Sequence, residues 1–247
     1  MTEAAIAPAS QEPWEASRDI AAQLAMGSLV KFFPKSLTQN GRLQLETLFC
    51  TIGALAGFAA QHAVRQEYVG EAHKENEVFV IALAPNGERY FFAEQLNALL
   101  VSERRDIISV WTILGGAALK LGATKVQLPD CVDTFERATK SIGTPEFGIP
   151  RLPPGHKPYL TPRRAIEIFW PSVLQVFTRE PVVPVPGFKL VAPRHWPLVL
   201  AAVAASFMPA LKDKLLPELA MTIFMEAAIP MSKIDQCAVR FVGARTH

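Results

Sequence analysis

The sequence predicts an α+β fold that is predominantly α-helical, with a multi-helix core and one β-hairpin near residues 77–92. Three observations support this prediction. Residues 43–64 are apolar and carry one formal charge, Glu46, as expected for an innermost helix. Small residues also recur elsewhere, as at 115–118, which predicts closely packed helices. β-branched and aromatic residues on both sides of Pro85-Asn86-Gly87 predict the hairpin.

The first half of the chain begins with a predicted amphipathic helix over residues 14–33. Apolar residues recur there at helical spacing, and we expect Pro34 to stop the helix because proline has no backbone N–H group. Asn40-Gly41 then breaks the chain before the long helix at 43–64. The later elements of this half follow from similar patterns: strands at 77–83 and 88–92, and helices at 93–101 and 106–121.

The strongest start signal in the second half is Thr161-Pro162, an N-cap threonine followed by proline at the first helical position. We expect this helix to be bent or broken at Pro171. Residues 180–195 are punctuated by proline and are predicted to be extended. The other predicted segments are a helix at 130–141, a loop from there to residue 160, and a final pair of helices at 197–211 and 217–228.

Composition separates a tail from a folded part. Residues 1–13 are rich in Ala, Pro, Ser and Glu and are predicted to be a disordered tail. Residues 14–247 are long enough to form a single globular domain with a sizeable core. Most of the 20 prolines fall between residues 143 and 197, so a sub-boundary within that stretch is the alternative.

Charge and cysteine usage bear on partners and compartment. The net charge is +2, which provides no global field for nucleic acid or for an anionic membrane, and neither is expected as a partner. The first basic residue is Arg18, so the chain lacks the basic start of a secretory signal. The three cysteines are far apart with no CxxC motif, as is typical of a reducing compartment. The prediction is a cytoplasmic protein.

Residues 43–64 also allow a membrane span, because a helix of this length covers roughly 33 Å. Polar side chains argue against it, since Gln44, Thr47, Thr51 and Gln61 form a stripe along one side of the helix. We therefore favour a buried helix of a soluble protein. On the neighbouring face, small residues including Gly53 and Gly57 form a groove in which another backbone could lie close, or in which a ligand could bind.

The segment from 151 to 164 carries the strongest local anomaly in charge. It contains Arg151, Lys157, Arg163 and Arg164 and no acidic residue. The last two lie in the first turn of a predicted helix, where the helix dipole disfavours cations. We expect a compensating anion there, which is either a carboxylate from elsewhere in the fold or a bound anionic ligand. Pairing of Arg163 with Glu167 and simple solvation of the charges are the ordinary alternatives.

Glu46 is a further candidate for ligand binding, as a buried acid with a raised pKa beside the Cys50/Gly53 groove, although a first-turn carboxylate is commonly just favoured by the helix dipole. Histidine and cysteine spacings predict no metal site. The sequence has no nucleophile motif, dinucleotide-binding motif or P-loop, so no cofactor and no catalytic residue is predicted.

These observations predict a soluble helical binding or interaction protein that holds a small anionic or amphipathic ligand or a protein partner. A homo-oligomer is compatible with the sequence. The first alternative is an enzyme that acts on a small anionic substrate through the basic helix start, and whether the protein is an enzyme stays open. The second alternative is a membrane-associated protein that uses residues 43–64.

Two segments also resemble a family of bacterial proteins of unknown function. They are GRLQLETLFCTIGALAGFAAQ at residues 41–61 and Arg89-Tyr90-Phe91-Phe92 followed by Glu94-Gln95-Leu96-Asn97. The likeness extends through most of the chain after the tail. It implies a self-contained intracellular protein and supplies no activity, substrate or site residues.

Overall fold

Helices surround one long central helix, α2 (Leu45–Tyr68). The computed structural model describes residues 14, 16, 19–102, 104, 107–180 and 188–242, and the predicted tail, residues 1–13, lies outside them. Within these ranges the other helices are α1 (Ile20–Leu37), α3 (Glu75–Val78), α4 (Glu94–Val101), α5 (Val110–Lys120), α6 (Cys131–Lys140), α7 (Pro162–Thr178), α8 (Trp196–Leu211) and α9 (Pro217–Met231). The predicted fold class, predominantly α-helical with a small β part, is confirmed.

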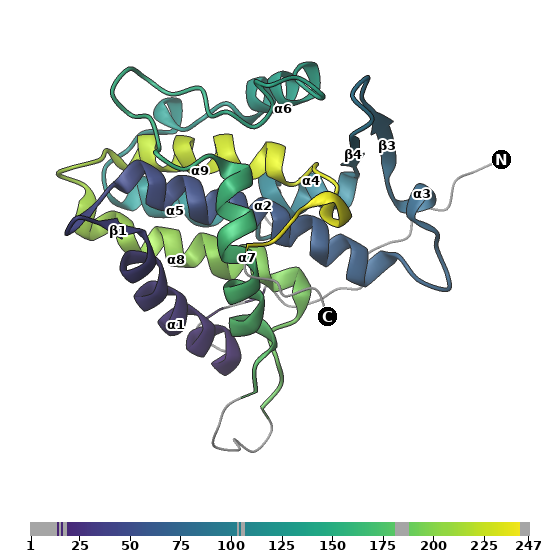
Figure 1. The fold of residues 1–247 in the computed structure, drawn as a ribbon. Coiled ribbons are helices and arrows are strands. Elements are labelled where there is room, and N and C mark those ends of the chain that lie inside the picture. Colours follow the sequence, from purple (N-terminus) through teal and green to yellow (C-terminus); the bar gives the residue numbers. More distant parts are fainter. Residues whose placement is uncertain are drawn as a thin grey trace.

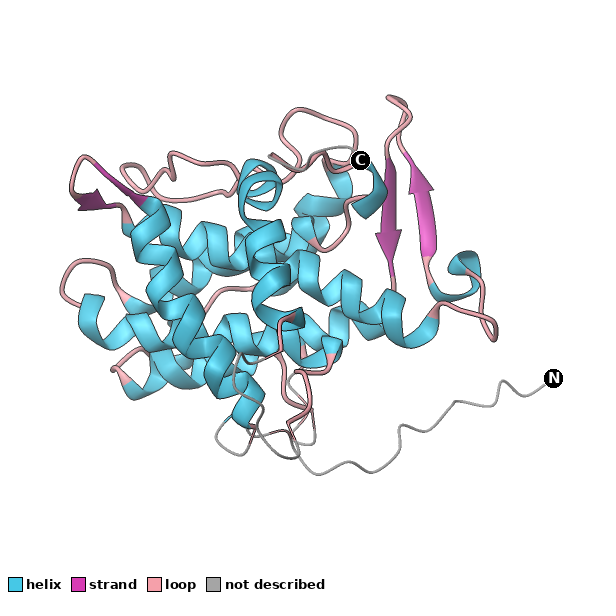
Figure 2. Ribbon diagram, turned by 60° about the horizontal axis from the view of Figure 1, so that its bottom comes forward, coloured by secondary structure: helices cyan, strands magenta, loops and turns pink. Residues whose placement is uncertain are grey.

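Two small antiparallel hairpins lie at opposite ends of the helical body (Figure 2). The predicted hairpin is formed by β3 (Val80–Leu83) and β4 (Arg89–Phe92), with Val80 opposite Phe92 and Leu83 opposite Arg89. The second hairpin pairs β1 (Thr38–Gln39) with β2 (Arg42–Leu43). It was not predicted, although Asn40-Gly41 is the typical turn sequence for it, and both turn residues have positive φ values of 50° and 75°.

The groove on α2 is filled by the backbone of α9. A Cβ atom added at Gly53 would lie less than 3.0 Å from the carbonyl oxygen of Phe224, and one added at Gly57 would lie equally close to that of Ala228. The two helices can approach this closely only because these glycines have no side chain. Of the two interpretations of the groove, close backbone packing is the one that the structure has.

Helix α9 lies between α2 and α6 (Figure 1). Helices α7 and α8 also pack against α2, and α1 packs against α7 and α8. The buried side chains form one hydrophobic cluster, which extends from Ala21 to Val239. Elements from both sides of the Pro-rich stretch therefore contribute to the same core.

Neither proline ends its helix. Helix α1 continues through Pro34 to Leu37, and Thr38 closes its last turn, since the Thr38 backbone N–H and hydroxyl both donate to the carbonyl of Pro34. Helix α7 is unbroken at Pro171. A proline leaves the carbonyl of the residue four positions earlier without its usual partner, and here that carbonyl, on Glu167, accepts the backbone N–H of Val242 at 2.8 Å.

Other boundaries shift because of local hydrogen bonds. The first helix begins at Ile20 rather than at residue 14, since the Asp19 side chain accepts the N–H of Ala22 and caps the helix. The strand predicted at 77–83 begins at Val80, because the preceding residues form α3. The larger of the remaining differences are the long helix at Leu45–Tyr68 instead of 43–64, α5 at Val110–Lys120 instead of 106–121, and α9 ending at Met231 instead of 228; the other elements differ by one residue at an end.

The segment predicted to be extended, 180–195, can be compared only in part. Residues 181–187 lie outside the described residues, and Pro193–His195 form a 3-10 turn rather than an extended segment. This turn leads directly into α8 at Trp196.

The glycine contact between α2 and α9 leads to a prediction about stability. We expect Gly57→Ala to lower the free energy of unfolding by about 3 kcal/mol, because the new Cβ meets backbone that cannot move aside. The matched control is Gly116→Ala in α5, where nothing lies within 4 Å of the added Cβ and alanine should stabilise the helix by roughly 1 kcal/mol. Urea unfolding gives the free energy of unfolding of both variants. Equal changes in this free energy for Gly57→Ala and Gly116→Ala would contradict the close approach of α9 to α2.

Candidate functional site

The two arginines at the start of α7 find their anions within the fold. Arg163 Nη1 donates to Glu88 Oε1 at 2.9 Å, and Arg164 Nη1 donates to Glu167 Oε2 at 2.8 Å. Hydrogen bonds from Arg163 and then from Tyr90 hold the pKa of the Glu88 carboxyl below its usual value. Of the two sources of a compensating anion considered from the sequence, the structure supplies carboxylates.

Glu46 is held at the start of α2 by a histidine. Its Oε1 lies 2.9 Å from His156 Nδ1, so it pairs with the loop that precedes α7. The same loop is fixed to the start of α2 by Gln44, whose Nε2 donates to the carbonyl of Lys157 at 2.9 Å. The Lys157 side chain is exposed. Glu46 and Lys157 therefore lie close together, at a place where the loop is anchored to α2.

Arg151 lies in a different part of the molecule, beside α9. Its backbone N–H donates to Glu226 Oε2 at 3.0 Å, while its side chain is exposed. Glu226 lies near the middle of α9, and its side chain is only 7% exposed. The sequence interpretation therefore named one residue, Arg151, that borders this buried carboxylate, and it missed the carboxylate itself.

Glu226 accepts hydrogen bonds from three residues, two on α6 and one in the loop before α7. Arg137 on α6 binds both carboxylate oxygens, through Nη2 to Oε1 and through Nη1 to Oε2 at 3.1 Å. The hydroxyl of Thr134, also on α6, donates to Oε1 at 2.9 Å. The backbone N–H of Arg151 adds the remaining bond. A two-pronged pairing of this kind is both strong and directional.

Arg137 is held as firmly as its partner. Its Nε donates to Asp133 Oδ2 at 2.8 Å, and its Nη2 also donates to the hydroxyl of Thr134 at 3.2 Å. The hydrogen bond to Glu226 raises the pKa of the Arg137 guanidinium, and the hydrogen bond from Arg137 lowers the pKa of Asp133. The Arg137 guanidinium is therefore held in its charged form between two carboxylates.

Two hollows lie on either side of this buried pair, and Thr134, Arg137 and Glu226 line both of them. One has a volume of about 410 Å³ and reaches Ser141 and Pro230. The other has a volume of about 400 Å³; we call it the Arg151 hollow, and its remaining lining residues are Pro129, Asp130, Asp133, Arg151, Leu152, Pro153 and Thr222. Ligand sites are lined mainly by apolar side chains with a few well-placed polar groups, and Thr134, Arg137 and Glu226 supply such polar groups to both hollows.

Among the described residues, the Arg151 guanidinium forms no hydrogen bond or ion pair, whereas the nearby carboxylates are engaged. Asp133 binds Arg137 through Oδ2, and Asp130 Oδ1 accepts the backbone N–H of Val132. Each aspartate keeps its second oxygen without such a bond. The Arg151 hollow thus offers one cationic group without a hydrogen bond, whose charge also acts on Asp133, and two anionic groups that each have one oxygen unbonded.

The sequence carried one signal that could have located this site. Glu226 is the single charged residue in the apolar run from Leu219 to Met231. A lone carboxylate in the middle of an apolar helix needs a buried partner. That partner, Arg137, could not be identified by spacing, because it lies far away in the sequence.

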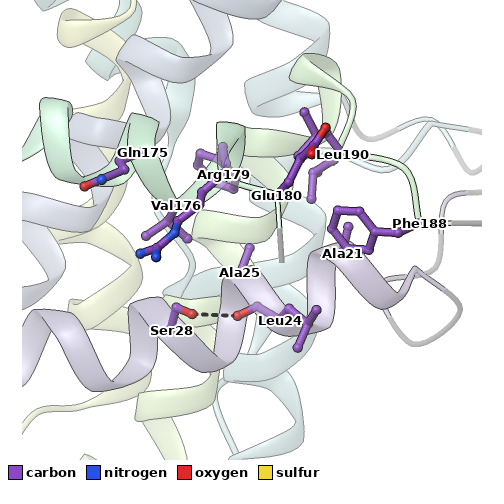
Figure 3. Close-up of a pocket in the computed structure, with 12 residues that line it drawn as sticks. Ala21, Leu24, Ala25, Ser28, Gln175, Val176, Arg179, Glu180, Phe188 and Leu190 are labelled. Atoms are coloured by element: carbon purple, nitrogen blue, oxygen red, sulfur yellow. Dashed lines mark hydrogen bonds between the residues drawn. The ribbon is translucent and has the colours of Figure 1, made fainter. Parts of the chain in front are cut away.

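A third hollow lies between α1, α7 and the segment Phe188 to Val191, with a volume of about 440 Å³ (Figure 3). Its lining is mostly apolar. Its polar side chains, Ser28, Gln175, Arg179 and Glu180, are all exposed. Because no buried polar group lines this hollow in the described part of the chain, we prefer the Arg151 hollow as the candidate site.

Lys233 is also a buried ionisable residue among those described, but unlike Glu226 it has no carboxylate as its partner. Its side chain is almost fully buried, and Nζ donates to Asn97 Oδ1 at 2.7 Å. Nζ also lies 5.5 Å from the ring centre of Phe92 and 5.2 Å from that of Phe135. Burial lowers the pKa of this ammonium to about 7. None of the hollows described above is lined by Lys233.

Helix α2 is the one described helix that is long and apolar enough to cross a membrane. In the structure, 94% of its most apolar stretch is buried by the rest of the protein. The core helix of a folded domain meets the same criteria, so this finding alone carries little weight. Among the described residues, no group of three or more His, Cys, Asp or Glu side chains could hold a metal ion.

Comparison with protein-family models, with curated proteins and with solved structures finds no match to this chain. The resemblance to a bacterial family of unknown function therefore stays a prediction.

The buried pair makes a second stability prediction. We expect Arg137→Met to lower the free energy of unfolding by about 3 kcal/mol, because it leaves the Glu226 charge buried without its main partner. The double variant Arg137→Met/Glu226→Met should recover more than half of that loss, since it removes the charge as well. Urea unfolding of Arg137→Met, Glu226→Met and the double variant gives the coupling free energy between the two side chains. Additive losses would contradict a coupled pair.

Lys233 makes a prediction about pH. Its folded pKa, about 7, is below its unfolded value, so between pH 7 and roughly 10 the unfolded chain binds a proton that the folded protein does not. The free energy of unfolding should therefore rise with pH in this range, by up to about 1.4 kcal/mol per pH unit from this group. The difference between the wild type and Lys233→Met in urea unfolding isolates the effect. A difference that is independent of pH would contradict it.

Proposed function

We propose that this protein is a soluble, cytoplasmic binding protein and that it holds a small ligand with both an anionic and a cationic group in the Arg151 hollow. The observation that carries the proposal is the buried Glu226–Arg137 pair that lines this hollow. A buried ion pair contributes little net stability compared with an apolar contact. Its presence beside an open hollow is better explained by the positioning of groups around a ligand.

The free charges of the hollow define the ligand. Glu226 and Arg137 neutralise each other, which leaves the guanidinium of Arg151 and the outer oxygens of Asp130 and Asp133. An anionic group of the ligand, such as a carboxylate, would pair with Arg151. An ammonium group would lie near the two aspartates. A purely anionic ligand would be repelled by the aspartates, so a zwitterion fits better.

Size and polarity narrow the ligand further. The hollow, at about 400 Å³, is near the lower end of the range for small-molecule sites. Pro129, Leu152 and Pro153 provide an apolar part of the lining. The combination suits a zwitterion with a short apolar side chain, that is, a molecule of the amino-acid class.

The alternatives named from the sequence draw less support from the geometry. An enzyme that holds an anion at the start of α7 would need free cations there, but Arg163 and Arg164 both pair with carboxylates. Attachment to a membrane through α2 would require this helix to leave the core, where most of it is buried.

A matched set of ligands tests the proposal by isothermal titration calorimetry. L-leucine has both charged groups, 4-methylpentanoate lacks the ammonium group, and 3-methylbutylamine lacks the carboxylate. We expect L-leucine to bind most tightly of the three. Arg151→Ala should weaken its binding at least about tenfold, because the pairing with the carboxylate is lost. The melting temperature should stay nearly unchanged, because the Arg151 side chain is exposed and the backbone N–H that binds Glu226 remains.

Lys157→Ala is the control, because it removes another exposed cation of the same basic segment at a different place in the fold. Binding of L-leucine by this variant should match the wild type. The proposal fails if none of the three compounds binds, or if Arg151→Ala binds L-leucine as the wild type does.

A further inference from the structure

The hollow between α1, α7 and the segment 188–191 has no part in the function proposed for the Arg151 hollow. Its volume is about 440 Å³, and we call it the Arg179 hollow. All three surrounding elements contribute apolar side chains to its lining: Ala21, Leu24 and Ala25 from α1, Val176 and Phe177 from α7, and Phe188, Leu190 and Val191 from the third element. An apolar lining with a few polar groups is typical of sites for small molecules.

The spacing of residues on α1 explains why space remains there. The α1 residues that line the hollow, Ala21, Leu24, Ala25 and Ser28, are three or four positions apart and share one face of the helix. Two of them are alanines, whose side chains end at Cβ. Leu24 is still 51% exposed and Leu190 is 44% exposed, so neither side chain fills the space. An apolar group bound here would remove this exposed surface from water.

Hydrogen-bond donors gather at one end of the Arg179 hollow. Gln175, near the end of α7, and Arg179, directly after α7, lie at the same end as Ser28 (Figure 3). In the part of the chain that the structure describes, neither the Gln175 amide nor the Arg179 guanidinium forms a hydrogen bond or ion pair. The Ser28 hydroxyl already donates to the carbonyl of Leu24 at 2.9 Å. This end therefore presents unpaired N–H groups, which suit an anionic oxygen.

The opposite end of the hollow is apolar. Phe188 and Leu190 lie there (Figure 3). One carboxylate, that of Glu180, also lines the hollow, and it lies beside Leu190, away from the Arg179 guanidinium. A negative charge is therefore attracted to the Arg179 end and repelled from the other end. A ligand with one anionic group and one apolar group has a single favourable orientation.

We infer that the Arg179 hollow binds a straight-chain alkanoate of medium length, as a second site beside the proposed one. The carboxylate pairs with Arg179 and accepts a hydrogen bond from the Gln175 amide, and the alkyl chain follows α1 from Ser28 toward Ala21. These two α1 residues are about 10 Å apart along the helix axis, because each residue adds about 1.5 Å. The extended chain of octanoate has a similar length.

The two hollows select different ligands. In an amino acid, the ammonium group is next to the carboxylate, so in the Arg179 hollow it would lie against the guanidinium of Arg179 and be repelled. The Arg151 hollow, in contrast, has the outer oxygens of Asp130 and Asp133 for such a group. Octanoate and L-leucine should therefore bind without competing, and failure of one proposal leaves the other standing.

Isothermal titration calorimetry with octanoate, octylamine, 1-octanol and acetate tests this inference. We expect octanoate to bind most tightly, because it alone has both the carboxylate and the long chain. Shortening it to hexanoate should weaken binding by up to about fourfold for each CH₂ removed. Arg179→Ala should weaken octanoate binding at least about tenfold. The melting temperature should stay nearly unchanged, because the Arg179 side chain is exposed.

Lys157→Ala is the control, since it removes an exposed cation that does not line the Arg179 hollow, and it should bind octanoate as the wild type does. NMR on the wild type gives a readout that needs no variant: octanoate should shift the amide signals of residues 21–28 and 188–191, also in the presence of excess L-leucine. The inference is overturned if octanoate does not bind, if octylamine or 1-octanol binds as tightly, or if Arg179→Ala has no effect. Shifts confined to other residues, or displacement of octanoate by L-leucine, also overturn it.

Discussion

Where Gly53 and Gly57 lack side chains, the backbone of α9 lies directly against α2, and the carbonyl oxygens of Phe224 and Ala228 occupy the space that two Cβ atoms would need. This contact sets both the distance between the two helices and the rotation of α9 about its own axis. Residues of a helix are separated by about 100° of rotation, so Glu226, two positions from either contact residue, faces the opposite side. The polar site beside α6 is thus a consequence of the packing on α2.

The face of α9 that points away from α2 carries Glu226 and packs against α6. A carboxylate in an apolar helix is costly to bury unless donors surround it, and α6 supplies them through Thr134 and Arg137. Because the guanidinium binds both oxygens, α6 is fixed in register along α9 as well as attached to it. The backbone N–H of Arg151 extends the same arrangement to the loop before α7. One carboxylate therefore orders a helix and a loop together.

Features that depend on neighbouring residues could be predicted from the sequence, and features that depend on distant ones could not. Thr161 caps α7 as predicted, because both the cap and its target lie within one turn. Of the predicted bend or break at Pro171, the break is absent, and Val242, far along the chain, satisfies the carbonyl that the proline leaves without a partner. The same holds for the site: the partners of Glu226 come from α6 and from residue 151, and no short motif links them.

The pairing of α2 with α9 has a consequence for the order of events during synthesis. About 170 residues separate Gly53 from Phe224, so at 5–20 residues per second the ribosome needs roughly 10 to 30 s to deliver the covering helix. Throughout that interval α2, the longest of the described helices, has no partner for its glycine face. Until α9 is made, near the end of synthesis, the nascent chain exposes this face and is prone to aggregation unless a chaperone shields it.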